Sequence, residues 1–425
     1  MSILDRIRAI RGKGRTRAEA PVPEAEPAAA DDLMSVADSP FDGFVDELSP
    51  YHVAGWLTGP GDCAFEVALP DGRVLGRGRA DQFKPGPSDA GQGTHGFLLR
   101  FERKLTAEER DAVVVRPVNA PAPLPRAACM LEEYRPVILN AMDIVDNCNL
   151  RCPFCLFDYS HVFKTNVMER ATIEAALRFL PYVPDSNFWF SCLHEPTLNP
   201  NFVEFLDLVP REYRRKVFFT TNLAKRMKPE YYRFLADGGF ANVNISIESR
   251  DPEIYERMRK GARYRIFAEN WQALLDAVAE GSAPPFLRYI TMVYRSNFAE
   301  IPDLVEHLVS ERRADEVQLR FTYDVAHIDD AFRKAEYIDE PQWDILDDLA
   351  RRYPPGKVVV VRPPTQQVVE EFFELRGRYQ FRTSWDGSVK VLQYRVPFPD
   401  EAHPLVETNV RDIADPLAFF ASLPA

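Results

Sequence analysis

Three cysteines with the spacing C-x3-C-x2-C, Cys148, Cys152 and Cys155, are the residues whose type and spacing best suit chemistry. Three thiolates on one short loop can ligate three irons of a cubane iron–sulfur cluster and leave the fourth iron open to an exogenous ligand. A structural zinc site with His161 as its fourth ligand is the alternative, but zinc sites favour paired cysteine knuckles. The triplet therefore predicts one [4Fe-4S] cluster with an open iron.

The sequence around the triplet alternates between apolar runs and amphipathic segments, a pattern typical of parallel strand–helix units. The predicted strands are VILNAMDIV, NFWFSC, KVFFTTN, NVNISI, FLRYITMV and EVQLRF. The predicted helices between them lie around residues 173–180, 202–209, 230–237, 267–279 and 301–309. Such units wind right-handed and close part of a barrel, whose chemistry lies at the carboxyl ends of the strands. The cysteines directly follow the first strand.

The predicted fold class is α/β, with a partial (β/α)6 TIM-type barrel at residues 133–325. Short β-like runs with Asp-Gly and Gly-Pro turns predict an N-terminal antiparallel β-sandwich domain at residues 41–120. Residues 326–425 are predicted to form a small α+β C-terminal extension. Residues 1–40 are basic at first and then rich in Ala, Pro and acids, which predicts a disordered tail and linker.

Composition excludes some kinds of partner. The net charge of -12 opposes the cationic surface that phosphate-backbone binding requires, so nucleic acid is not a predicted partner. We find neither an apolar stretch long enough to span a bilayer nor a secretory signal, which predicts a cytoplasmic protein without an integral membrane segment. Six cysteines in 425 residues are too few for a disulfide scaffold.

The motif and its place after the first strand resemble those of the radical S-adenosylmethionine (SAM) superfamily. In that family an aromatic residue precedes the last cysteine, as Phe154 does here, and SAM chelates the open iron. The resemblance spans about residues 137–321 and implies a [4Fe-4S] cluster and SAM as cofactors. It also implies that the backbone of Phe154 lies close to the adenine of SAM.

The later strand ends resemble the SAM-binding segments of the family, in the same order. Ser191-Cys-Leu-His-Glu195-Pro196 is similar to the family's Gly-Gly-Glu-Pro, which implies that Glu195 accepts the SAM amino group, although Leu193 and His194 replace the glycines. Taken singly, such residues are more often helix caps or surface charges. The other positions implied for SAM binding are Asn222, Ser246, Glu248 and Arg259.

The resemblance also implies the chemistry. The reduced cluster donates an electron to SAM, which releases methionine and a 5'-deoxyadenosyl radical that abstracts hydrogen, and a reductant such as flavodoxin or ferredoxin supplies the electron. A strand KVVVV, a helix at about 366–376 and a hairpin turned at Asp386-Gly387 are predicted in the C-terminal extension, and the hairpin resembles the family's SPASM or Twitch region. No cysteine follows Cys192, so a second cluster is not expected there. We therefore predict a redox-neutral epimerisation, rearrangement or elimination.

Three residues near predicted strand ends are the candidate catalytic groups. Cys192 is the spare thiol of the barrel and a possible hydrogen donor, and the alternative is a small buried residue beneath the cluster loop. His194 is a candidate acid or base, and Arg320 a candidate anchor for the substrate. For a histidine such as His194, the alternative is a structural residue whose hydrogen bonds are satisfied.

The substrate class rests on the N-terminal residues. GFVDELSPYHVAGWL and GTHGFLLRF resemble an accessory β domain that accompanies bacterial glycosyltransferases, which implies a small-molecule sugar or a glycan-linked substrate. A peptide-modifying radical SAM enzyme is the second hypothesis, because many relatives with degenerate C-terminal extensions modify peptides. The third is a non-catalytic glycan-binding protein with a structural metal site.

Overall fold

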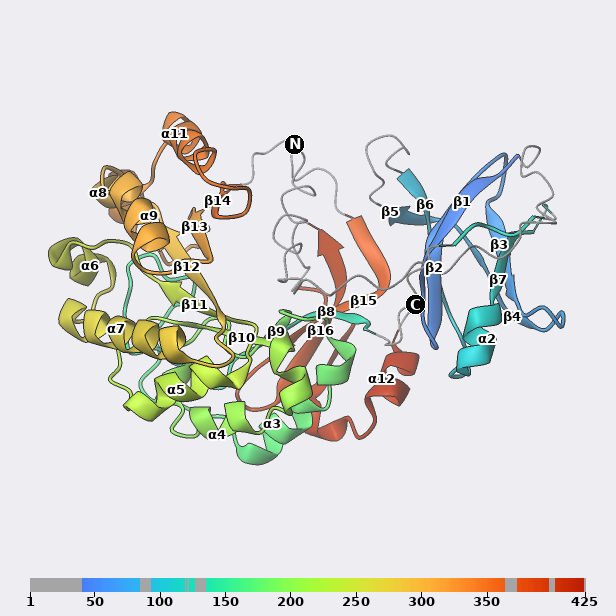
Figure 1. Ribbon diagram of the computed structural model, residues 1–425, viewed down its shortest axis with the longest axis horizontal. Helices are drawn as coiled ribbons and strands as arrows, with labels where there is room; N and C mark the ends of the chain where they lie inside the picture. The colour runs from blue at the N-terminus through green and yellow to red at the C-terminus, as the bar shows by residue number, and fades with distance from the viewer. Residues whose placement is uncertain are drawn as a thin grey trace. The chain divides into compact units, whose positions relative to one another are not determined.

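The chain divides into two compact units in this computed structural model (Figure 1). Unit 1 comprises Met1–Tyr134 and Phe373–Gly377, and unit 2 comprises Arg135–Phe372 and Arg378–Ala425. The structure describes residues 40–84, 93–118, 120, 122–126, 135–363, 373–396 and 402–423. The predicted basic tail and linker lie outside these residues.

Unit 1 contains two antiparallel sheets. The first has the strand order β1 (Asp42–Leu48), β2 (His52–Thr58), β6 (Gly93–Arg100), β5 (Gln82–Lys84). The second has the order β4 (Val74–Arg79), β3 (Ala64–Ala68), β7 (Val114–Pro117). Both sheets contribute to one hydrophobic core, with Val53 and Leu57 from β2 and Phe65 and Val67 from β3 almost fully buried. Period-two alternation produces this core, because every second side chain of a strand points to the same face.

Helix α2 (Ala107–Ala112) of unit 1 begins at a capping box. The Thr106 hydroxyl accepts from the Glu109 backbone N–H at 3.1 Å, and the Glu109 carboxylate accepts from the Thr106 N–H at 3.1 Å. Both N–H groups would otherwise lack an intrahelical partner, so this pair defines where the helix starts.

Unit 2 is built on one large mixed sheet. Its parallel strands stand in chain order, each beside the next: β8 (Val137–Met142), β9 (Phe188–Trp189), β10 (Val217–Thr221), β11 (Asn242–Ser246), β12 (Phe286–Met292), β13 (Glu316–Arg320) and β14 (Val358–Val361). Beyond β8 the sheet continues with β15 (Phe373–Thr383), β16 (Ser388–Val396) and β17 (Val406–Asn409). This order confirms the predicted partial TIM-type barrel core.

Helices follow most of the parallel strands. The α-helices are α3 (Arg170–Leu177), α4 (Phe202–Asp207), α5 (Pro229–Gly238), α6 (Pro252–Met258), α7 (Tyr264–Glu280), α8 (Arg295–Phe298), α9 (Ile301–Ser310), α10 (Asp330–Glu336), α11 (Glu340–Ala350) and α12 (Pro416–Ser422). Short 3-10 turns are η1 (Leu180–Tyr182), η2 (Pro196–Leu198), η3 (Arg211–Lys216) and η5 (Val410–Asp412). None of the described helices has the length and apolar character that a membrane span requires.

The two faces of the parallel sheet differ in character because side chains alternate along each strand. On β12, Tyr289 faces the helices, and its ring lies 5.8 Å from that of Trp271 on α7, which runs along the outer side of the sheet (Figure 1). Arg288, one residue earlier, points to the inner face and pairs with Glu316 of β13 at 2.9 Å. The inner face therefore carries charged groups where a complete TIM barrel has packed aliphatic layers.

Three expected elements differ in extent. β9 is only Phe188–Trp189, because the chain after it turns around the carboxylate of Asp143. The valine run at 358–361 pairs in parallel with β13, so the parallel sheet continues beyond residue 325. Residues 373–376 belong to β15 and not to the helix predicted at 366–376, whose earlier residues lie outside the described ranges. The hairpin turned at Asp386-Gly387 is confirmed, with Gly387 at φ +88°.

Candidate active site

The three cysteines lie on the loop that follows β8, at the edge where the carboxyl ends of the parallel strands meet. The Cys155 backbone N–H donates to the Cys152 carbonyl at 3.1 Å, which closes a tight turn. The Arg151 N–H donates to the Lys260 carbonyl at 2.8 Å, so the segment after α6 holds the loop from the side. Gly261 in that segment has φ +102°, a conformation that glycine adopts without steric cost.

All three thiols are free and partly buried. Burial raises the pKa of Cys148 to about 11, and it also raises the pKa values of Cys152 and Cys155. The thiols are close enough to act on one another electrostatically, since Cys155 raises the pKa of Cys148 and both raise that of Cys152. Metal ligands are thiolates, so loading this loop with a metal cluster must release protons.

The donor set fits a cubane cluster better than a single ion. Across the described ranges, no three His, Cys, Asp or Glu side chains gather tightly enough to hold one metal ion. His161 is exposed and belongs to no such group of side chains in the described ranges. A cubane binds its thiolates through separate irons, which suits three neighbouring thiols that do not converge on one point.

Asn222, at the end of β10, contacts the cluster loop directly. Its side-chain Nδ2 donates to Asn149 Oδ1 at 2.9 Å and to the Cys148 sulfur at 3.5 Å. Its Oδ1 accepts from the Ala224 backbone N–H at 2.8 Å, which fixes the orientation of the amide. A hydrogen bond to a ligand sulfur is one of the groups by which a protein adjusts the potential of a cluster.

Glu195 is buried and joins the loop after β9 to the end of β10. Its carboxylate accepts from the Thr197 hydroxyl at 2.6 Å, the Thr221 hydroxyl at 3.0 Å and the Asn222 backbone N–H at 2.8 Å. Burial raises the pKa of Glu195, and these donors oppose the rise. The carboxylate therefore has a structural task here, and its contact with the SAM amino group stays a prediction.

Glu248 and Arg259 form a buried bidentate ion pair. Arg259 Nε donates to one carboxylate oxygen of Glu248, and Nη2 donates to the other at 2.7 Å. Burial lowers the pKa of Arg259, but the Glu248 carboxylate outweighs it, so the pKa is raised and the guanidinium stays charged. Within the described part of the chain, its Nη1 has no hydrogen-bond partner. That group remains open to a ligand.

Phe154 and Ser246 lie at the same edge. Phe154 is buried in a small apolar cluster, with its ring 5.1 Å from that of Tyr294 and close to Met258. The Arg259 guanidinium lies 6.0 Å from the centre of the Phe154 ring, which links the ion pair to the cysteine loop. Ser246 ends β11, and its hydroxyl makes no hydrogen bond to another described residue.

His194 joins the cysteine loop to the loop after β9. Its Nδ1 lies 2.8 Å from the Tyr159 hydroxyl, and its ring meets that of Phe157 edge-on at 4.7 Å. Arg151 lies over the Tyr159 ring at 4.8 Å and continues the stack. Burial lowers the pKa of His194 to about 4, so the imidazole is neutral at pH 7. The arrangement gives His194 a positioning contact between the two loops.

Asp143, which we did not single out from the sequence, organises the loop after β9. Its Oδ1 accepts from the backbone N–H groups of Cys192, Leu193 and His194 at 3.0, 2.9 and 3.2 Å. The Ser191 hydroxyl is a fourth donor at 3.4 Å. This carboxylate explains how the chain turns where the family has glycines. The sequence feature that could have identified Asp143 is its place, as an acidic residue directly after the buried strand β8.

Cys192 and Arg320 lie on the inner side of the sheet. Arg382 of β15 directs Nη1 to the Cys192 sulfur at 3.8 Å. Arg320 ends β13, and burial lowers its pKa, with Arg288 adding to the effect and Cys192 opposing it. Cys192 therefore acts electrostatically on Arg320. The structure thus brings two of the predicted catalytic residues into one region.

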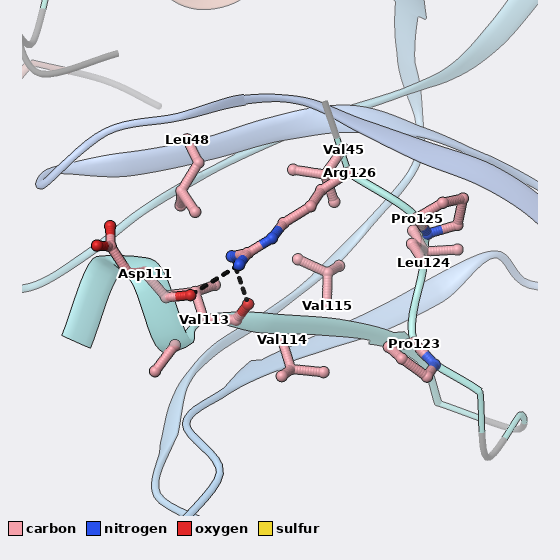
Figure 2. Close-up of a pocket in the computed structure, with 11 residues that line it drawn as sticks. Val45, Leu48, Asp111, Val113, Val114, Val115, Pro123, Leu124, Pro125 and Arg126 are labelled. Carbon is pink, nitrogen blue, oxygen red and sulfur yellow. Dashed lines mark hydrogen bonds between the residues drawn. The ribbon is translucent and has the colours of Figure 1, made fainter. Parts of the chain in front are cut away.

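A separate cavity lies in unit 1 (Figure 2). It has a volume of about 280 Å³, and its walls are mainly Val, Leu and Pro side chains. Arg126 extends into it and donates to the backbone carbonyls of Asp111 at 2.8 Å and Val113 at 3.4 Å. None of the residues predicted for catalysis, SAM binding or metal binding lines this cavity.

Residues 142–308 match the family model described as Radical SAM superfamily. Members of that superfamily use a [4Fe-4S] cluster and SAM. The matched segment contains the cysteine loop and the strand ends from β9 to β12 described above.

Individual relatives are distant. The chain is 23% identical over 175 residues to GTP 3',8-cyclase of Microcystis aeruginosa, a match covering 40% of this chain and 52% of that protein. It is 26% identical over 174 residues to a probable GTP 3',8-cyclase of Thermococcus kodakarensis, with 40% and 53% covered. The chain thus spans about half the length of these curated relatives. Among solved structures, Streptococcus suis SuiB bound to S-adenosylmethionine matches with 14% identity and a TM-score of 0.46, over 65% of this chain and 64% of SuiB.

Proposed function

This chain carries a radical SAM domain over residues 142–308, and we propose that it is an enzyme that cleaves SAM reductively with a [4Fe-4S] cluster on Cys148, Cys152 and Cys155. The observation that supports this most is the set of three free, neighbouring thiols on the loop after β8. When bound, the reduced cluster and SAM supply a 5'-deoxyadenosyl radical, which abstracts a hydrogen atom from an unactivated carbon.

In this chemistry the protein binds the cluster and SAM, orients SAM and keeps water away from it. The three thiolates bind three irons, and the Asn222 amide donates to the Cys148 sulfur. We assign the SAM carboxylate to Arg259, whose Nη1 is open, and the SAM ribose or carboxylate to Ser246. The buried ring of Phe154 keeps water from the adenine side.

Glu195 and Glu248 complete the proposed SAM site. Glu195 is proposed to accept from the SAM amino group while its protein donors orient the loop after β9, and Glu248 holds Arg259. The open Nη1 of the fixed guanidinium can donate to the SAM carboxylate, which favours one orientation of SAM.

The reaction that we propose is redox-neutral. No cysteine follows Cys192 in the sequence, so the C-terminal region supplies no thiolates for a second cluster that could accept a substrate electron. The Cys192 thiol, partly exposed on the inner face, is the proposed hydrogen donor to a substrate radical. A cytoplasmic setting with a flavodoxin or ferredoxin as reductant belongs to this proposal.

The substrate is less defined than the cofactor chemistry. The expected sugar or glycan-linked substrate finds no support among the relatives above, two of which are named for GTP. Another solved SuiB structure is bound to the precursor peptide SuiA, with 13% identity and a TM-score of 0.43. Peptide modification therefore remains the second candidate, and the relatives support it no more strongly than they support a sugar substrate.

The test is formation of 5'-deoxyadenosine by the anaerobically reconstituted protein, given SAM and a strong reductant. Wild type and Cys63→Ser should produce it, whereas Cys148→Ala should not, because Cys63 lies beside the core of unit 1 and Cys148 carries one iron. Equal loss in both variants contradicts the proposal. One zinc in place of iron and sulfide would favour the non-catalytic binding protein.

A further inference from the structure

Arg320 is a charged group without a counter-ion. Its side chain has no hydrogen bond or ion pair to any residue in the described ranges. The side chain is partly buried, and burial lowers its pKa. A partly buried charge without an ion pair is available to an oppositely charged ligand.

The side chain of Arg320 faces the interior of the partial barrel. Alternation along β13 puts Arg320 on the same face as Gln318 and Glu316, while Val317 and Leu319 are fully buried on the helix side. The register across the sheet places Arg320 beside Met292 of β12. Arg320 therefore lies on the inner face at the carboxyl end of β13, where a barrel presents its reactive groups to substrate.

The acidic group nearest in the sequence, Glu316, raises the pKa of Arg320, but it makes no ion pair with it. Glu316 already binds Arg288, whose Nε donates at 2.9 Å, and Gln318, whose Nε2 donates at 2.5 Å. Arg288 in turn lowers the pKa of Arg320, which shows that the two cations oppose each other. The inner face near β13 thus has more positive than negative charge.

A third arginine contributes to the same region. Arg382 reaches the Cys192 sulfur from β15, and Cys192 acts electrostatically on Arg320. The proposed hydrogen donor therefore contacts the Arg382 guanidinium and acts electrostatically on that of Arg320.

We propose that the substrate carries an oxyanion, a carboxylate or a phosphate, that binds Arg320 at the carboxyl end of β13. This inference rests on the proposed function, and it adds the substrate class. The guanidinium forms two parallel hydrogen bonds to such a group, which orients the substrate relative to Cys192 and the cysteine loop.

The experiment is calorimetric titration of the cluster-loaded, SAM-saturated protein with inorganic phosphate and, separately, with acetate. Wild type should bind one of these anions at a single site. Arg320→Gln should weaken that binding about ten-fold or more, because one charge-assisted contact is lost. Arg320→Lys keeps the positive charge but loses the two parallel donors of the guanidinium, so it should bind the anion with intermediate affinity. Binding by this variant also shows that a substitution at residue 320 leaves the protein folded. Arg265→Gln on the exposed side of α7 is the matched control.

Weakening for phosphate supports a phosphorylated substrate, and weakening for acetate supports a carboxylate substrate. Unchanged binding of both anions in Arg320→Gln overturns the inference. It is also overturned if the anion binds only when SAM is absent, because Arg320 would then hold the SAM carboxylate. Formation of 5'-deoxyadenosine by wild type tests the proposed function separately, so the two can fail independently.

Discussion

At the scale of single residues, much of the candidate site consists of carboxylates that accept from backbone and hydroxyl groups. The Glu195 carboxylate accepts hydrogen bonds from groups after β9 and at the end of β10. The Asp143 carboxylate accepts from three backbone N–H groups of the loop after β9. Such groups do not need to touch a substrate to matter. They hold loops that would otherwise expose unpaired backbone donors.

Asp143 leads to a prediction with a definite sign. Burial raises its pKa from 3.8 to about 6 in the folded protein, so the folded state binds the proton more tightly than the unfolded state. The contribution to stability is fully present below about pH 4 and is lost as the pH rises through about 6, an effect of about 3 kcal/mol. Relative to Asp143→Asn, the wild type should become more stable as the pH falls from 6 to 4, as urea unfolding can measure.

The same variant should bind SAM more weakly at pH 7, because a neutral amide holds the loop after β9 less firmly than a carboxylate. Equilibrium dialysis with SAM checks this. A pH-independent stability difference together with unchanged SAM affinity would show that Asp143 does not organise the loop.

At the scale of elements, the strand ends are held by the helices behind them. Leu223, directly after β10, has φ +50°, a strained conformation for a residue with a side chain. Asn270 of α7 donates from Nδ2 to the carbonyls of Leu223 at 2.7 Å and Lys225 at 2.8 Å. α7 thereby fixes the turn that presents Asn222 to the cysteine loop.

Replacing Asn270 by Ala should release this turn. One buried and one partly buried carbonyl lose their donor, so we expect a loss of about 1–3 kcal/mol in the free energy of unfolding. The Asn222 contact with Cys148 should also loosen, which would shift the electron paramagnetic resonance signal of the reduced cluster. Gln272→Ala, on the exposed side of the same helix, is the control. An unchanged signal in Asn270→Ala would show that the contact from α7 does not influence the cluster.

At the scale of the whole molecule, each unit has its own interior. The core of unit 1 is a closed cluster of its own residues, and the residues proposed for catalysis all belong to unit 2. Damage to one core should therefore leave the chemistry of the other unit intact, provided that unit 2 does not need unit 1 to fold.

Leu57→Ala tests this independence. Leu57 is fully buried in β2, and its truncation should cost about 2–5 kcal/mol through lost burial and a residual cavity. We expect an early unfolding transition in calorimetry, while 5'-deoxyadenosine formation at moderate temperature stays at the wild-type rate. A parallel loss of activity would show that unit 1 supports the active site.

The sequence by itself determined the cysteine triplet, the strand order and the approximate helices, because thiol spacing and hydrophobic periodicity are local properties of the chain. Its predictions failed where a distant partner decides the conformation. The second strand stops at Trp189 because a carboxylate 46 residues earlier in the chain, at Asp143, turns the segment that follows.

Only the tertiary structure decided which polar side chains already have partners. Glu248 and Arg259 pair with each other, His194 pairs with Tyr159, and Arg320 is left without a counter-ion in the described residues. These residues come from strands and loops far apart in the sequence. Their pairing depends on curvature and register of the sheet, which no local pattern encodes.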